Sequence, residues 1–471
     1  MKQYVYKYFG VFLLCLFCFA TQGFAQESYL LKELRIPQVL QENPGAVVPY
    51  DAHISFPALG KVHMGANSPL SWGEMFYISD NWLKRKGKNN MIRFWLQDDI
   101  INLGFRENGR EKNYFSIITT LKVDANVVFQ KDLLALLIDG NTSPQNEKLS
   151  LVKNNFISVN SYFELGVGYN REVNENISFG LNVKYLLGIL NAHTKKADLS
   201  LTTGENYHEL VLDQNIQGKF ACGHDLFYII DVLQDASIKN PLKHLIQKTS
   251  LRDFKNHGFS VDVGGRYRIN DMFEVNASVL DIGFIKWTSN PYQLNIDNKP
   301  FTFEGYNPEG DVLDNSNKDY FSKIKEYFKG LSDSLLNNFN TEVEESASYT
   351  KWLNTKVNIW ASVYASPKDR LSLSFRGLFI NNILIPSGSV SYTRNCGKWF
   401  DVVIGNTFKP NSVFNPGLGM NFTLNVFQLY AAVDYTNTLP YIDKVKNLNL
   451  VFGINFVAPI EKKKIKSSYP Y

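Results

Sequence analysis

Charged side chains occupy alternate positions in several otherwise apolar segments of the chain. The set comprises Lys184, Asp262, Arg266, Arg268, Arg376 and Asp434. Side chains two residues apart point to the same face of a β-strand. If that face lines an aqueous passage, these groups could bias the passage toward anions. A water-filled interior must also be polar for structural reasons alone, and that explanation accounts for the same residues.

Motifs for enzyme or metal chemistry are missing. The sequence has no His-Glu-x-x-His, no Gly-x-Ser-x-Gly and no phosphate loop. Cys222-Gly223-His224 offers two potential ligands, whereas a zinc site needs about four. The net charge of +4 gives no broad basic field for nucleic acid. We therefore predict no catalytic residue, no cofactor, no metal and no nucleic-acid partner. Whether Cys222 and Cys396 form a disulfide stays open.

The segments that carry the charges alternate with period two, as β-strands do. In 259–269, apolar residues and one glycine fill the odd positions, and Ser, Asp, Gly and Arg fill the even ones. The same alternation occurs in 177–189, 356–365, 371–376, 418–426, 427–435 and 448–456. Most reach the ~9–11 residues that a tilted transmembrane strand needs. A soluble β-sandwich or β-helix would also alternate, but strands in soluble proteins average about 5–6 residues.

The N-terminus predicts export from the cytoplasm. Lys2 and Lys7 precede an apolar run over 10–20, and Gly23-Phe24-Ala25 places small residues before a cut. This pattern is typical of a cleaved signal peptide, here 1–25. The apolar run is shorter than the ~20 residues of a spanning helix. Together with the one-sided strands, the signal predicts a barrel in the outer membrane, with outer-membrane lipid against its apolar face.

Short and long connections alternate along the chain, which predicts the topology. Short ones are expected at Arg171–Glu175, Asn270-Asp271, Ser366–Asp369, Asn395–Lys398 and Asn425-Val426. Longer ones are expected at 68–90, 130–155, 190–256, 290–350 and 437–445. Outer-membrane barrels have short periplasmic turns and long outer loops. The sequence thus predicts an all-β, antiparallel transmembrane β-barrel of about 14 strands over 61–458, followed by a basic periplasmic tail at 459–471.

Two kinds of segment lie outside the strand pattern. Residues 26–60 contain four prolines and alternate only weakly. We expect them to form an N-terminal plug in the barrel mouth, and a periplasmic tail with one extra strand is the alternative. Helical spacing of apolar residues predicts amphipathic helices in outer loops at 320–338 and 223–249. A short helical turn is expected over 133–138.

The chain resembles a Bacteroidetes outer-membrane β-barrel family of unknown function. The matching strings are KNYFSIITTLKVDANVVFQKDLLALLIDGN (112–141), NVKYLLGILNAHTKKADLSLTT (182–203) and VNASVLDIGFIKWTSN (275–290). More distantly, it is similar to the long-chain fatty-acid transporter barrels, which have 14 strands and an N-terminal hatch with an Asn-Pro-Ala motif. Asn43-Pro44-Gly45 occupies the corresponding place, and its third residue departs from that motif. The resemblance implies a hatch carrying this motif.

The strand pattern, the expected plug and the resemblance lead to two functional hypotheses of different classes. The first is passage of small compounds, hydrophobic ones included, through a plugged outer-membrane barrel, with a small hydrophobic ligand as the partner. The second is a barrel that transports nothing and serves as a platform for a secretion or surface-attachment complex. In that case the partner would be a secretion-machinery protein bound by loops 190–256 and 290–350. An enzyme is not expected, because no acid–base or nucleophile cluster was found.

Overall fold

The computed structural model describes most of the chain from residue 29 onward. The described residues are 29–68, 71, 89–107, 112–139, 147–154, 156–203, 210–223, 255–296, 301–303, 341–380, 383–409, 413–436 and 445–459. The predicted signal peptide 1–25 and the tail from residue 460 lie outside these ranges. So do the helix expected over 320–338 and, apart from residue 223, the helix expected over 223–249.

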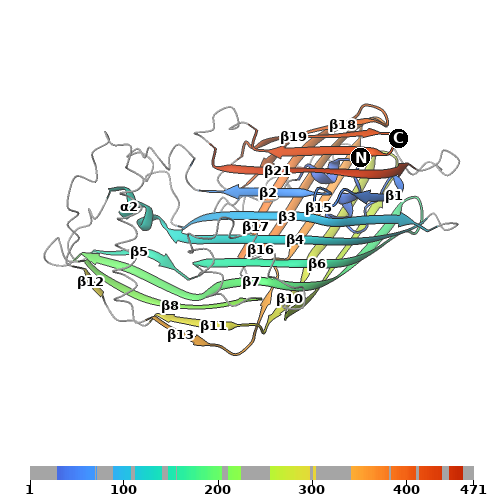
Figure 1. Cartoon of the computed structure of the whole chain (residues 1–471). Helices are drawn as coiled ribbons and strands as arrows, with labels where there is room; N and C mark the ends of the chain where they lie inside the picture. Colours follow the sequence, from blue (N-terminus) through green and yellow to red (C-terminus); the bar gives the residue numbers. More distant parts are fainter. Residues whose placement is uncertain are drawn as a thin grey trace, which may run out of the picture.

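The strands close into a single ring (Figure 1). In ring order they are β1 (Tyr50–Ser55) with β2 (Val62–Asn67), β3 (Asn89–Arg106), β4 (Asn113–Gln130), β6 (Ile157–Glu172), β7 (Ile177–Thr203), β9 (Asn256–Arg268), β10 (Phe273–Trp287), β14 (Tyr349–Trp352) with β15 (Lys356–Tyr364), β16 (Asp369–Ile380), β17 (Ile383–Asn395), β18 (Phe400–Phe408), β19 (Pro416–Leu424), β20 (Phe427–Asp434) and β21 (Asn447–Pro459). Every neighbouring pair is antiparallel, and β21 pairs with both β1 and β2. This confirms the predicted closed barrel of 14 strands.

The two faces of the ring differ as the alternation predicted. On β7, Phe179 and Val183 are 46% and 40% exposed on the outer face, whereas Ser178 and Asn182 are buried on the inner face. Large apolar side chains are exposed in the same way on most strands of the ring. An apolar outer face around a polar interior is the arrangement that a lipid bilayer requires.

The five short connections were predicted correctly. They join β6 to β7, β9 to β10, β15 to β16, β17 to β18 and β19 to β20 at residues 173–176, 269–272, 365–368, 396–399 and 425–426. Two of them contain left-handed residues, Gly397 and Asn425, whose residue types tolerate that conformation. All five lie at one end of the barrel, which we call the short-turn end.

The barrel begins earlier than predicted, which corrects the boundary at residue 61. β1 starts at Tyr50 and pairs with both β21 and β3, so part of the expected plug, 26–60, belongs to the wall. Residues 56–61 protrude between β1 and β2, and the Phe56 amide and the Leu59 carbonyl both bond to Ile454. These extra residues interrupt the alternation, so the sequence pattern revealed only the second half of this strand.

Strands continue past the ring where loops were expected. β7 runs on to Thr203, and β5 (Lys148–Lys153), β8 (Leu210–Cys222), β11 (Pro291–Ile296), β12 (Phe301–Phe303) and β13 (Thr341–Glu345) extend the sheet away from the short-turn end (Figure 1). β8 pairs with β7, β11 and β12, and β11 also pairs with β13. The prediction of loops throughout 190–256 and 290–350 was therefore wrong for these stretches. These strands form by pairing with strands that are distant in sequence, and local sequence patterns do not reveal such pairing.

Helices are few among the described residues. α2 (Lys131–Asp139) follows β4 and confirms the helical turn expected near 133–138. Two 3-10 helices, η1 (Leu31–Glu33) and η2 (Pro37–Gln41), lie in the segment that precedes β1. None of the helices described is both long and apolar enough to cross a membrane.

Candidate functional site

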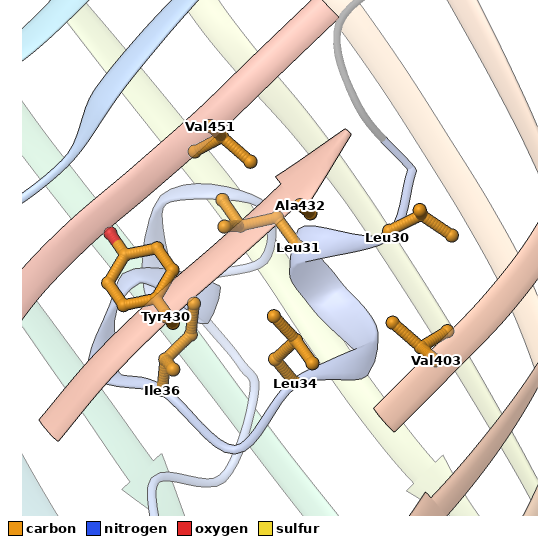
Figure 2. Close-up of a cluster of buried hydrophobic side chains, with 8 residues drawn as sticks. All are labelled: Leu30, Leu31, Leu34, Ile36, Val403, Tyr430, Ala432 and Val451. Atoms are coloured by element: carbon orange, nitrogen blue, oxygen red, sulfur yellow. The ribbon is translucent and has the colours of Figure 1, made fainter. Parts of the chain in front are cut away.

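Residues 29–49, here called the N-terminal segment, lie inside the ring. Figure 2 shows one side of this segment packed on the inner faces of β18, β20 and β21. The cluster consists of Leu30, Leu31, Leu34, Ile36, Val403, Tyr430, Ala432 and Val451, all almost fully buried. Removing these apolar side chains from water stabilises the inserted position at roughly 25 cal/mol per Å² of buried area. The segment is thus held on one side by a small hydrophobic core.

The opposite side of the segment is held by hydrogen bonds from Asn43. Its side-chain Nδ2 donates to the carbonyl of Gly265, 3.1 Å away, and to Oδ1 of Asn276, 3.2 Å away. Its Oδ1 accepts from the amide of Gly45 at 2.9 Å. Asn43 is fully buried, so each of these bonds replaces one that water would otherwise supply. The side chain therefore shapes the turn and also attaches it to β9 and β10.

The backbone of the same turn lies directly on the barrel wall. Asn170 donates to the carbonyl of Pro44 at 2.6 Å, and Ser178 donates to that of Gly45 at 2.6 Å. A Cβ added at Gly180 would come within 1.9 Å of the Pro44 carbonyl oxygen, and one added at Gly45 within 2.6 Å of the Gly264 carbonyl oxygen. Close approach therefore requires glycine at position 45. This gives a physical reason for the departure from Asn-Pro-Ala.

Three ion pairs link the segment to the wall. Their members are Glu33 with Arg370 (2.9 Å), Arg35 with Asp401 (2.5 Å) and Glu42 with Arg376 (2.5 Å). All six side chains are buried or mostly buried. A buried charge that loses its partner is costly, so these pairs fix the position of the segment more firmly than exposed pairs would.

Lys32 lies in the segment without a carboxylate partner. Its ammonium group donates to Ser374 Oγ and lies over the rings of Trp360 (4.9 Å) and Tyr29 (5.2 Å). Among the described residues, no carboxylate is within ion-pair distance of its Nζ. Burial lowers the pKa of the Lys32 amine to about 7, against an opposing effect of the neighbouring Glu33 carboxylate.

Farther from the short-turn end, six charged side chains form a network that we call the charge belt. Its members, from successive strands of the ring, are Lys122, Glu164, Lys184, Asp262, Asp281 and Lys356. Positive and negative groups are equal in number. The closest contacts are 2.7 Å, from Lys184 to Asp262 and from Lys184 to Asp281. The belt is therefore electrically balanced within itself.

Asp281 is the centre of the charge belt. Its carboxylate lies 3.0 Å, 2.7 Å and 3.6 Å from the ammonium groups of Lys122, Lys184 and Lys356. The residue adopts a φ of 59° at a register shift between β9 and β10, and its amide donates to Asp262 at 2.7 Å. Asp is one of the few residue types that visit this left-handed region. The irregularity in β10 thus places the Asp281 carboxylate close to three lysine ammonium groups.

Two cavities border the N-terminal segment. The first, about 520 Å³ including space open to solvent, lies between the charge belt and Gln41, Glu42 and Lys61. The second, about 850 Å³ on the same measure, lies between the segment and strands β9, β10, β15 and β16. Charged and polar side chains contribute much of both linings. The segment therefore leaves partly open, largely polar space on two of its sides.

The six charged residues singled out from the sequence all lie on the inner face, in separate groups. Lys184 and Asp262 belong to the charge belt. Arg376 binds the N-terminal segment through Glu42. Arg266 pairs with Glu274 at 2.7 Å, Arg268 with Asp271 at 3.3 Å, and Asp434 accepts from Asn449 at 2.9 Å. They therefore do not form one continuous row.

Four members of the charge belt were missed in the sequence. These members are Lys122, Glu164, Asp281 and Lys356. Alternation could have assigned three of them to the inner face of their strands, but at Asp281 the register shift disturbs the alternation. Their pairing depends on ring closure and is not local. Cys222 and Cys396 are both free thiols. Within the described ranges, no group of three or more His, Cys, Asp or Glu side chains is placed to hold a metal.

Comparison with solved structures finds barrels of similar architecture. The Ralstonia pickettii toluene transporter TbuX is 9% identical, with 90% of this chain and 94% of that chain covered and a TM-score of 0.44. A Pseudomonas aeruginosa FadL homologue is also 9% identical, with 91% and 95% covered and a TM-score of 0.40. At such identities and TM-scores, the likeness carries no information about a ligand. No curated protein matches the sequence significantly.

The family comparison is more extensive. Residues 44–434 match a family described only as a family of unknown function, DUF5723. The match begins at Pro44, inside the turn bound to β9 and β10, and includes every strand of the ring except β21. It covers far more than half of the chain, and the chain therefore belongs to the DUF5723 family.

Proposed function

We propose that the chain is an outer-membrane barrel through which small solutes pass, and that its N-terminal segment acts as the plug. One observation carries the proposal. The segment is attached to strands around the ring, while partly open cavities remain on two sides of it. The apolar outer face supports residence in a membrane. The motif-poor sequence is in line with a protein that is not an enzyme.

The linings of the cavities favour a polar solute over a hydrophobic one. Lys122, Lys184 and Lys356 and their carboxylate partners face the first cavity, where an apolar molecule would displace water from charges without replacing its hydrogen bonds. A polar solute can instead exchange hydrogen bonds with the wall. The small hydrophobic ligand suggested by the distant resemblance is therefore the less favoured choice.

Conductance across planar bilayers tests the plug. Deleting residues 29–48 leaves β1 and the ring intact, so the variant should conduct small ions better than the full chain. Its folding is checked by heat-modifiable gel mobility in detergent. A correctly folded deletion variant with unchanged conductance would remove the plug from the proposal.

A platform for a secretion or surface-attachment complex is the second candidate. It is favoured by the sheet that β5, β7, β8, β11 and β13 build beyond the ring, a surface that passage does not need. Co-purification from gently solubilised membranes separates the two candidates. A stoichiometric protein partner would support the platform, and its absence together with conductance by the deletion variant would support passage.

A further inference from the structure

The cavity on the short-turn side of the N-terminal segment is rich in cations. Four cationic and two anionic side chains line it. They are Lys32, Arg35, Arg266 and Arg370 against Glu33 and Glu274. Asn395 and Tyr364, which adjoin short turns, also line the cavity, so it lies near that end of the barrel.

Both carboxylates in this lining are already engaged. Glu274 accepts from Arg266 at 2.7 Å and from Asn276 at 2.9 Å. One oxygen of Glu33 accepts from Ser372 at 3.0 Å and lies 2.9 Å from an Arg370 nitrogen. Neither carboxylate lies within ion-pair distance of Lys32. Arg35 pairs at 2.5 Å with Asp401, which lies outside the lining. Among the described residues, the Lys32 ammonium is therefore the cationic group of the lining that pairs with no carboxylate.

Two cationic groups in the lining retain donors. An ammonium group has three N–H donors, and Lys32, which is 7% exposed, directs one to Ser374 and lies over the rings of Tyr29 and Trp360. Among the described residues, its other two N–H groups have no oxygen acceptor. The buried Nε of Arg370 has no acceptor among the described residues. Oxyanions are the ligands that lysine and arginine bind most strongly, through charge-assisted hydrogen bonds.

We propose that this cavity binds a small oxyanion, a carboxylate or a phosphate, between Lys32 of the N-terminal segment and Arg370 of β16. The ligand would accept hydrogen bonds from both groups and balance the charge of the lining. It would also connect the segment to the wall at a point where the two carry charges of the same sign. If small solutes pass through the barrel as proposed, oxyanions are the class that this site would bind. Binding at the site does not itself require passage.

The fluorescence of Trp360 reports on this site, because its ring lies 4.9 Å from the Lys32 ammonium group. The purified full chain in detergent is titrated with inorganic phosphate and, separately, with acetate at constant ionic strength. Trp360→Phe gives the background from the other tryptophans. We expect a saturable change that depends on Trp360, and the stronger of the two probes identifies the preferred oxyanion.

Substitutions then locate the site. Lys32→Met removes the ammonium group without leaving a carboxylate unpaired and should weaken binding about tenfold, in line with one charge-assisted hydrogen bond. Arg370→Gln should weaken it similarly. Lys148→Met, which makes the same charge change on β5, should bind as the full chain does. No saturable change with either probe, or equal affinity in correctly folded Lys32→Met, would overturn the proposal. Neither outcome affects the conductance test.

Discussion

Lys122 on β4 and Asp281 on β10 meet at 3.0 Å, although three strands separate β4 from β10 around the ring. Neighbouring strands are about 4.8 Å apart, so the path along the wall is roughly 19 Å. The pair therefore crosses the curve of the interior instead of following the wall. The charge belt is in effect a crosslink that narrows the lumen at this level.

Asp281→Asn should destabilise the barrel strongly. The substitution removes the carboxylate that three lysines share and leaves the charge belt with three positive and two negative groups, a loss of about 3–5 kcal/mol for a broken buried pair. Denaturant unfolding in detergent measures it. Asp213→Asn serves as the matched control, because its pair with Lys148 is much more exposed and should contribute only about 0–1 kcal/mol. An equal decrease in the free energy of unfolding in the two variants would contradict a central role for Asp281.

Gly180→Ala should displace the N-terminal segment. The added Cβ would lie 1.9 Å from the Pro44 carbonyl oxygen, and overpacking of this kind costs about 1–3 kcal/mol. We expect lower stability together with higher conductance in planar bilayers. Gly218→Ala is the control, since its Cβ would meet nothing closer than 3.6 Å. A conductance increase in the control as well would show that the effect does not arise from the segment.

The pair of Glu42 with Arg376 should show a larger coupling energy than an exposed pair on the same strand. A double-mutant cycle with Glu42→Gln and Arg376→Gln isolates the interaction. Both side chains are buried, so we expect a coupling of more than about 1 kcal/mol. The pair of Asp369 with Arg394, half-exposed at 2.9 Å, provides the comparison. Coupling no greater than in that pair would mean that Glu42 does not anchor the segment.

Stability should depend on pH through Lys32, which is not on a membrane-spanning strand. Its pKa is lowered to about 7 in the folded chain, so between about pH 7 and its ordinary value the unfolded chain binds more protons. Stability therefore rises with pH in this window, by at most about 1.4 kcal/mol per pH unit. The difference between the full chain and Lys32→Met, measured without phosphate or carboxylate buffers, isolates this contribution. If the free energies of unfolding of the two proteins differed by the same amount from pH 7 to pH 10, this contribution of Lys32 would be contradicted.

The sequence predicted the architecture well because alternation and turn residues are local signals. Segment 259–269 coincides largely with β9, and the five short connections fall where Asn, Asp, Gly and Ser cluster. The start of the barrel was misplaced because residues 56–61 interrupt one strand without ending it. Only the pairing of Tyr50–Ser55 with β21 and β3 shows that both halves belong to one strand.

The interior was harder to predict from sequence. Inward-facing charges such as Lys184 and Arg376 could be identified from alternation, but their partners could not. Glu42 belongs to a segment that is distant in sequence from Arg376. Asp281 lies at an irregularity of β10 that changes the face on which its side chain lies. Contacts of this kind are set by ring closure and by where the N-terminal segment sits.

The pairing of β21 with β1 and β2 also constrains the order of assembly. The first and last strands of the ring are neighbours, so the ring cannot close before nearly the whole chain has been synthesised, and closure carries the entropic cost of a very long loop. Leu31 and Ile36 pack on β20 and β21, among the last strands to be made. The N-terminal segment is therefore made long before the strands on which it packs. We therefore expect the segment to reach its final position late, when the barrel closes.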